Sequence, residues 1–160
     1  MSVTLDDFDR RILQALQENA RLSNVALAER VLLSPSQCSR RLQALEAAGL
    51  IGGYHARLDR EAVGLGVLAY VTVTLGAHGE DRARAFHDAV VAMPAVLECQ
   101  LITGDGDYLL KVVAADLNAF SRILTDELMR LPGVSNLRSN IALTAIKDSA
   151  VLPIGAPSGR

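Results

Sequence analysis

Apolar residues recur at helical intervals in three short stretches within the first third of the chain. We expect helices over residues 6–19, 24–31 and 34–49. Ser23 is a suitable N-cap for the second of these helices. A tight turn that contains two leucines joins the second helix to the third. This order predicts a helix-turn-helix, whose last helix normally lies in the major groove of DNA.

The third of these helices has clear ends and two unlike sides. Ser34 is a good N-cap, Pro35 suits the first helical position, and Gly49 is a natural left-handed stop. An apolar stripe on one side consists of Cys38, Leu42 and Leu45. The opposite side carries hydroxyl, amide and guanidinium groups, which belong to Ser36, Gln37, Arg40 and Gln43, with Arg41 at its edge.

The polar side of this helix carries the groups that bind base edges in the major groove. Arginine can bond two acceptors of guanine, glutamine can do the same to adenine, and serine can bond a base or a phosphate. Backbone N–H groups near Ser23 and Asn24 can hold a phosphate. An ordinary solvated helix surface has a similar composition, so the DNA-reading interpretation depends on the helix-turn-helix around it.

The hydrophobic period changes from helical to alternating after residue 66. Strands are predicted over residues 67–75, 96–102, 108–114 and 134–146, and helices over residues 80–93 and from Asp116 to Leu131. The order β-α-β-β-α-β predicts a ferredoxin-like sheet with both helices on one face. Apolar residues occur on both faces of the strands, so we expect two subunits to pack together on the uncovered face.

These patterns predict an α+β chain of two domains. We expect a winged-type helix-turn-helix domain over residues 1–53, a linker strand and hinge over 54–65, a ferredoxin-like domain over 66–148 and a flexible tail over 149–160. The linker strand is predicted from an alternating run that follows two glycines. The tail is predicted from its proline, glycine and serine content.

Composition and charge agree with this division. Half of the residues are apolar and 21% are charged, which is typical of a folded globular protein. Residues 20–60 carry a net charge of +3 and residues 61–160 a net charge of −3, so the positive segment is the one suited to approach DNA. We expect a cytoplasmic protein without a secretory leader or membrane span, in which Cys38 and Cys99 are reduced thiols.

The sequence lacks the residue patterns of the common enzyme and metal sites. It contains no Gly-rich phosphate loop, no Gly-x-Ser-x-Gly elbow and no His or Cys pair at zinc spacing. Asp105 and Asp107 do not form a calcium loop, because Leu109 stands where a third ligand is needed. We expect His78 and His87 to be solvated. The chain is therefore expected to have no catalytic residue, no metal and no cofactor.

Residues 104–108, Gly-Asp-Gly-Asp-Tyr, predict a hairpin turn between two strands. The glycines permit a left-handed backbone, and the aspartates accept hydrogen bonds from nearby N–H groups. This structural role accounts for the composition by itself. A ligand-binding role for the loop comes only from resemblance to a known family.

Several motifs resemble those of the leucine-responsive/asparagine-responsive (Lrp/AsnC) transcriptional regulators of bacteria and archaea. In the first domain these motifs are Ser34-Pro35-x-x-Cys38 and Leu45-Glu46-x-x-Gly49-x-Ile51-x-Gly53-Tyr54. In the second domain the motif is Gly104-Asp105-x-Asp107-Tyr108-Leu109-Leu110-Lys111. The resemblance covers nearly the whole chain. It implies a DNA-binding domain joined to a RAM/AsnC-type domain that binds an amino acid.

In the family that the chain resembles, small effectors bind beside this loop between neighbouring dimers. An amino-acid effector needs an acceptor for its ammonium group, here Asp105 or Asp107, and N–H donors for its carboxylate, here those of the glycines. The implied effector site consists of Leu101, Thr103, Gly104, Asp105, Gly106, Asp107, Tyr108, Ser135 and Asn140. Two departures leave the effector open, because Gly106 replaces a bulkier residue and Asn140 replaces a frequent aromatic one.

The resemblance also implies a dimer, assembling to an octamer, on double-stranded DNA within the nucleoid. The expected DNA-binding residues are Ser23, Asn24, Ser34, Ser36, Gln37, Ser39, Arg40 and Arg41. Among them Ser36, Gln37 and Arg40 are expected to contact bases, whereas Ser34, Arg41 and Ser23 are expected to hold phosphates. Two other functions stay open. One is an architectural DNA-wrapping protein with weak sequence preference, and the other is an enzyme subunit with an amino-acid sensor, for which no residues remain to form a catalytic domain.

Overall fold

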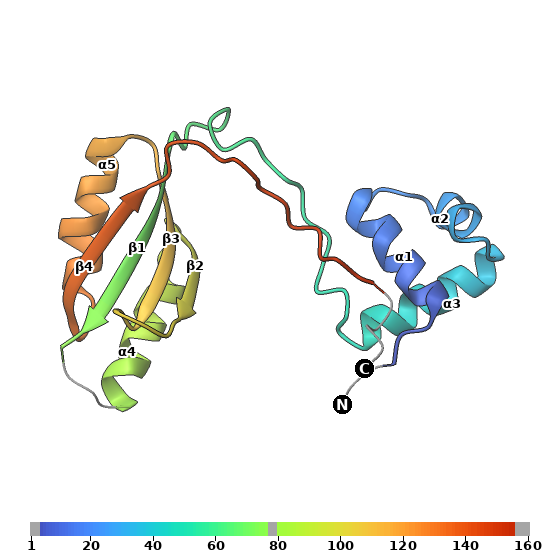
Figure 1. Ribbon diagram of the computed structural model, residues 1–160, viewed down its shortest axis with the longest axis horizontal. Coiled ribbons are helices and arrows are strands. Elements are labelled where there is room, and N and C mark those ends of the chain that lie inside the picture. The colour runs from blue at the N-terminus through green and yellow to red at the C-terminus, as the bar shows by residue number, and fades with distance from the viewer. Residues whose placement is uncertain (1–3, 77–79, 156–160) are drawn as a thin grey trace. The chain divides into compact units, whose positions relative to one another are not determined.

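The computed structural model describes residues 4–76 and 80–155, and these form two compact units (Figure 1). The first unit holds the described residues up to Ala56 together with those from Lys147 onward, and the second holds Arg57–Ile146. In the described residues, no helix is both long and apolar enough to cross a membrane.

The first unit is built on three helices, which are α1 (Asp7–Glu18), α2 (Asn24–Val31) and α3 (Pro35–Ala47). Each helix begins after a polar N-cap whose side chain accepts a hydrogen bond from an N–H of the first turn. These caps are Asp6, Ser23 and Ser34. The three predicted helices are confirmed, and the second and third caps are the predicted ones.

The apolar sides of the three helices form one small core. Its buried members are Ile12, Leu13, Ala15, Leu27, Ala28, Val31, Cys38 and Leu45. The turn between α2 and α3 depends on Leu32, which has a left-handed φ of 60° and a side chain that is 78% exposed. The Leu33 N–H then bonds the Ala28 carbonyl at 2.9 Å, which ends α2 and directs the chain into α3.

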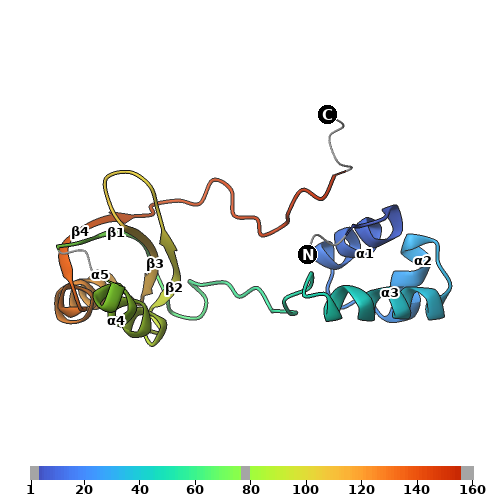
Figure 2. The same cartoon turned by 90° about the horizontal axis from the view of Figure 1, so that it is seen from below.

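The second unit is an antiparallel sheet with helices on one face. Its elements are β1 (Val67–Leu75), α4 (Glu80–Val91), β2 (Val96–Leu101), β3 (Tyr108–Ala114), α5 (Leu117–Arg122), the π turn η1 (Ile123–Glu127), the 3-10 turn η2 (Leu128–Arg130) and β4 (Val134–Ile141). The strand order is β2-β3-β1-β4. Figure 2 shows α4 and α5 on the same side of this sheet. The predicted ferredoxin-like topology is confirmed.

Side chains along the central strand β1 alternate between the covered face and the open face of the sheet. Ala69, Val71 and Val73 are fully buried in the core, whereas Tyr70 is 40% exposed. Thr72 has the same phase as Tyr70 and therefore also belongs to the open face.

Two boundaries differ from the sequence prediction. β4 ends at Ile141 and not at residue 146. α5 ends at Arg122 and passes into η1 and η2, where a continuous helix to Leu131 was predicted. Residues 54–58 have no hydrogen-bonded neighbouring strand within the described residues, so the predicted linker strand, which would pair with its counterpart in a second subunit, stays a prediction.

The C-terminal segment, for which the sequence predicts a flexible tail over residues 149–160, makes contacts in its described part. Its described residues belong to the first unit, and the backbones of Leu152 and Ile154 are hydrogen-bonded to side chains of α1. The sequence did not indicate these contacts, because they use backbone groups of the segment, which leave no pattern in the sequence. Residues 156–160 and His78 lie outside the described part of the chain.

Candidate functional site

The N-terminus of α3 is closed by a reciprocal pair of hydrogen bonds between Ser34 and Gln37. The Gln37 N–H donates to Ser34 Oγ, and the Ser34 N–H donates to Gln37 Oε1, both at 3.3 Å. Ser34 Oγ also donates to Gln37 Oε1 at 3.0 Å. The side-chain carbonyl of Gln37 is therefore used by the cap, and its amide NH₂ is the part that can contact another molecule.

The side of α3 that the sequence predicts to be polar is open to solvent. Ser36, Gln37 and Arg40 are exposed, and Ser39 is half-buried. Within the described residues, no hydrogen bond or ion pair holds the Arg40 guanidinium. The helix thus presents one cation and several neutral polar groups, which is a composition suited to base edges.

Arg41 is held within the domain. Its Nη1 donates to Asp6 Oδ2 at 2.6 Å and to Asp9 Oδ1 at 2.8 Å, and its guanidinium carbon lies 5.4 Å from the centre of the Phe8 ring. These two bonds raise the pKa of Arg41. The pKa of Asp6 is lowered mainly by the hydrogen bond that its carboxylate accepts from the Asp9 N–H, and to a smaller extent by Arg41. The bonds fix α3 against α1. The predicted phosphate contact of Arg41 stays a prediction.

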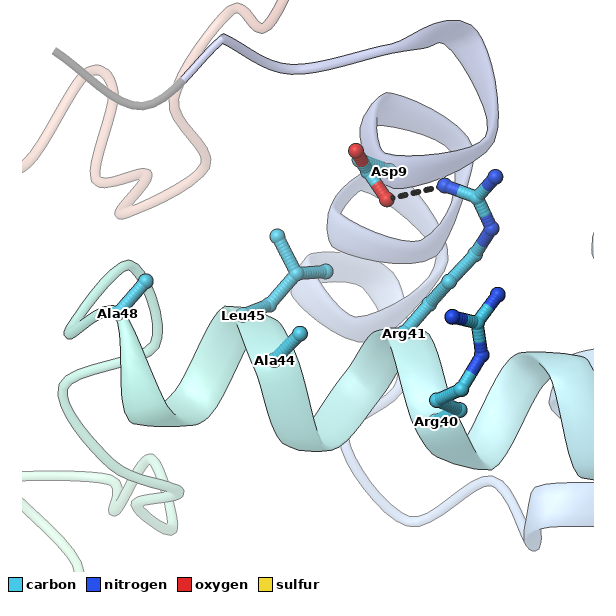
Figure 3. A pocket seen from close by; sticks show the side chains of 6 residues that line it. All are labelled: Asp9, Arg40, Arg41, Ala44, Leu45 and Ala48. Atoms are coloured by element: carbon cyan, nitrogen blue, oxygen red, sulfur yellow. Dashed lines mark hydrogen bonds and ion pairs between the residues drawn. The ribbon is translucent and has the colours of Figure 1, made fainter.

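A pocket of about 340 Å³ lies between α1 and α3 beside these charges (Figure 3). Its lining residues are Asp9, Arg40, Arg41, Ala44, Leu45 and Ala48. Figure 3 shows the side chain of Arg41 reaching to Asp9, while the neighbouring Arg40 carries no such bond. The two arginines are therefore unequal, since only Arg40 keeps all its donors for a partner.

The start of α2 is tied to the start of α3. Asn24 Nδ2 donates to the Pro35 carbonyl at 3.0 Å, and Ser23 Oγ accepts from the Ala26 N–H at 3.2 Å. The side chains of Ser23 and Asn24 are thus used inside the domain. What they leave for a phosphate is the set of unpaired backbone N–H groups in the first turn of α2.

The loop between β2 and β3 is stapled to β1 by Asp107. The Asp107 N–H donates to the Val73 carbonyl at 2.9 Å, and Asp107 Oδ2 accepts from the Leu75 N–H at 2.7 Å. Gly104 has a φ of +115°, so its predicted conformational role is confirmed. Asp105 is exposed. Of the two candidate acceptors for an ammonium group, Asp105 is therefore the one whose carboxylate is open to solvent.

Gly106 is buried where the loop crosses the open face of the sheet. A Cβ at this position would lie 2.2 Å from Thr72 Cγ2, which is far inside van der Waals contact. With Thr72 in its present position, the loop can take this path without a shift only if residue 106 is glycine. Sequence reasoning missed Thr72, because nothing in the sequence pairs a residue in the middle of β1 with the loop.

Tyr108 is a core residue. It is 5% exposed, its ring centre lies 4.7 Å from that of Phe86, and its hydroxyl is 2.9 Å from His87 Nε2. Burial raises the pKa of Tyr108. His87 is exposed as predicted, but the sequence did not indicate this bond, because residues 87 and 108 meet only when α4 packs on β3.

The remaining effector candidates lie at two different places on the sheet. Leu101 and Thr103 are exposed beside the loop, and Ser135 Oγ donates to the Thr74 carbonyl at 3.0 Å near the same end of β1. Asn140 lies opposite Tyr70, about 10 Å further along the strand from the loop. Within this chain, Ser135 therefore lies near the loop and Asn140 does not. The described residues also contain no cluster of three or more metal-ligating side chains.

Both units match established protein families. Residues 5–51 match the winged helix-turn-helix DNA-binding family, and residues 68–152 match the Lrp/AsnC ligand binding domain. The leucine-responsive regulatory protein of Klebsiella pneumoniae is 40% identical over 150 residues, which cover 94% of this chain and 92% of that protein.

Solved structures show the same two-part chain. A transcriptional regulator from Neisseria meningitidis, solved as a complex with L-Met, is 45% identical and has a TM-score of 0.90, covering 94% of this chain and 97% of that one. An AsnC family transcriptional regulator from Agrobacterium tumefaciens is 33% identical with a TM-score of 0.88, covering 93% and 97%. The chain therefore belongs to the Lrp/AsnC family of transcriptional regulators, with a helix-turn-helix DNA-binding domain followed by a ligand-binding domain.

Proposed function

We propose that this protein is a sequence-specific, dimeric regulator in the cytoplasm whose binding to DNA changes with an amino-acid effector. The observation that carries the DNA part is the solvent-facing side of α3, where Ser36, Gln37 and Arg40 stand on a helix with a capped start. The ion pairs of Arg41 hold this helix against α1. A fixed helix supports base reading because donors must keep their positions to distinguish one base from another.

The proposed contacts divide into two kinds. Ser36, the Gln37 amide NH₂ and Arg40 contact base edges, and Ser39 and Ser34 lie beside them. The phosphate contacts come from the backbone N–H groups at Ser23 and Asn24 and from Arg41, whose Nη2 and Nε donate to neither aspartate. Two such helices in a dimer then contact half-sites one helical turn apart, about 34 Å, or a multiple of it.

Arg40→Ala tests the base-reading role. On a site selected from random-sequence DNA, the substitution should cost about 1–3 kcal/mol in binding free energy, and on unselected DNA it should cost little. Arg30→Ala is the matched control, since Arg30 is an exposed arginine of the same domain that pairs with Glu18. Fluorescence anisotropy measures both variants. Equal losses on both kinds of DNA would assign Arg40 to the backbone.

The same measurements separate this function from architectural wrapping. A wrapping protein binds mainly through phosphates, so its affinity falls steeply with salt and is similar on every sequence. Specific readout predicts that the affinity for selected DNA is much higher than the affinity for random DNA at both salt concentrations. The modest net charge of +3 over residues 20–60 supports specific readout. A ratio near one at both salt concentrations would support wrapping.

The proposed effector is an α-amino acid bound at the loop of residues 103–107. Support comes from the match to a ligand-binding domain and from the Neisseria regulator, which was solved with L-Met. Asp105 accepts from the ammonium group, because the Asp107 carboxylate already bonds the Leu75 N–H. Backbone N–H groups of the loop bind the carboxylate. Asn140, which lies away from the loop, contributes from a neighbouring subunit.

A thermal-shift screen of the amino acids tests the effector proposal. The true effector should raise the Tm of the ligand-binding domain, because a ligand that binds only the folded state stabilises it by mass action. Asp105→Asn should abolish this rise, and Asp88→Asn, which neutralises another exposed aspartate on α4, should leave it intact. No rise for any amino acid would remove the proposal.

Self-association is proposed through the open face of the sheet. Tyr70 is 40% exposed there and Leu109, which lies opposite Thr72 on β3, is half-buried, so apolar surface remains available. We expect dimers by this face, with residues 54–58 of two subunits pairing, and octamers when dimers meet beside the loop. Sedimentation velocity with and without the effector measures the assembly. A monomer at all concentrations would contradict the proposal.

A further inference from the structure

The C-terminal segment is bound along one side of α1, whose side chains form hydrogen bonds with the backbone of the segment. Gln17 makes two of these bonds with Leu152, as Nε2 donates to the Leu152 carbonyl at 3.2 Å and Oε1 accepts from the Leu152 N–H at 2.6 Å. Gln14 Nε2 donates to the Ile154 carbonyl at 2.9 Å. Arg10 Nη1 donates to the Gly155 carbonyl at 3.0 Å.

The three donors have the spacing of one helix face. Arg10, Gln14 and Gln17 follow each other at intervals of four and three residues, so they form a row along α1. The row bonds the backbone of an extended peptide, and the Gln17 amide pairs with Leu152 as a neighbouring strand would. These hydrogen bonds therefore recognise the backbone of the segment and not its side chains.

One apolar side chain anchors the segment. Ile154 is half-buried and packs against the core of the three helices, whereas Val151 and Leu152 are 53% and 68% exposed. A peptide held by one inserted side chain and a row of backbone hydrogen bonds is expected to bind with low affinity. Weak binding is sufficient here, because the peptide belongs to the same chain and short flexible linkers give effective concentrations on the order of millimolar.

The bound segment follows the last strand of the ligand-binding unit in the chain, so it connects that unit to the helix-turn-helix unit. β4 ends at Ile141 in the ligand-binding unit, and residues 142–151 lead from there to the bound segment in the helix-turn-helix unit. The helix-turn-helix is already joined to the other unit through residues 52–59, which contain no helix or strand. The bound segment is thus a second attachment between the two units.

We infer that residues 152–155 are an intramolecular ligand of α1, which ties the helix-turn-helix domain to the ligand-binding domain at a second point. The tether closes a loop of chain that contains the whole ligand-binding domain. It limits rotation of the helix-turn-helix about its first linker and stabilises α1. This role does not depend on DNA or on an effector.

Hydrogen exchange of the full-length protein, read by mass spectrometry, tests the tether. Ile154→Asp should increase the opening of α1 about tenfold, because it places a charge where an apolar side chain packs. Leu152→Asp is the matched control, since that side chain is exposed and the backbone bonds remain. Gln14→Ala combined with Gln17→Ala should reproduce the effect from the α1 side, and both positions tolerate alanine because they lie on a helix surface.

The two domains give separate readings in this experiment. Exchange in β1 and β3 should stay unchanged in every variant, which shows that the ligand-binding domain remains folded. Unchanged protection of α1 in Ile154→Asp and in the double variant would overturn the tether. Protection of α1 that rises with protein concentration would also overturn it, because the segment would then bind another copy of the chain. The experiment uses no DNA, so the exchange results can be interpreted even if the wild-type protein fails to bind DNA.

Discussion

Gly106 offers a sharp test of how closely the loop of residues 103–107 crosses the sheet. Replacing it with alanine adds one methyl group, whose carbon would lie 2.2 Å from Thr72 Cγ2. Ordinary carbon contacts are about 3.5–4.0 Å, so the Thr72 side chain, the loop or β1 must move by more than about 1 Å. Overpacking of this size costs about 1–3 kcal/mol in free energy of unfolding.

Among the atoms of the described residues, only Thr72 Cγ2 lies too close to the added carbon, so a change at Thr72 should relieve the clash. The other atoms near the added carbon are the Val73 carbonyl at 3.4 Å and Thr72 Cβ at 3.7 Å, both at ordinary contact distance. Thr72→Ser removes only the clashing methyl group and keeps the hydroxyl. In the Gly106→Ala background it should therefore restore most of the lost stability, whereas Thr72→Val, which keeps branching at Cβ, should not.

Thermal unfolding of the ligand-binding domain measures this double-mutant cycle. A loss of 1 kcal/mol lowers the Tm of a domain of this size by about 4–8 °C. A Gly106→Ala protein as stable as the wild type would refute the close crossing. So would a Thr72→Ser substitution that restores nothing, because the strain would then lie elsewhere in the loop.

Two further changes act on the helix-turn-helix domain. Tyr54 donates to Glu46 at 2.8 Å, and burial with this bond raises the pKa of Tyr54 to about 12. Because the unfolded tyrosine ionises near pH 10, stability from this group is present below pH 10 and is lost as the pH rises to about 12. Urea unfolding should show a smaller loss over that range in Tyr54→Phe than in wild type. Leu32→Asn should raise the free energy of unfolding by about 1 kcal/mol, since asparagine adopts the left-handed conformation more easily than leucine. A stability below wild type in the same assay would show that Leu32 is needed for its side chain.

Periodicity was enough to predict the elements and their order. Cys38 and Leu45 are buried and Arg40 is exposed, as the helical spacing predicts. The alternation along β1 holds in the same way. These features depend on local sequence, because a helix or strand that buries one face must repeat its apolar residues at its own period.

The features that sequence could not predict depend on pairs of distant elements. Arg41 lay at the edge of the polar face, and only the packing of α1 on α3 places it against Asp6 and Asp9. The turn η1 was missed because a change from i+4 to i+5 bonding leaves the apolar spacing almost unaltered. The strand predicted over residues 54–58 has no neighbour within the described chain, and its pairing with a second subunit stays a prediction.

The bonds of Asp107 and Ser135 have a mechanical consequence. Val73 and Leu75 bond the loop through Asp107, and Thr74 between them bonds Ser135 at the start of β4. Three successive residues of one strand therefore serve as a common anchor for two segments distant in sequence. A molecule that pulls on the loop must either break both Asp107 bonds or drag the end of β1 and the beginning of β4 with it. A displacement of the loop should therefore also displace the end of β1 and the start of β4.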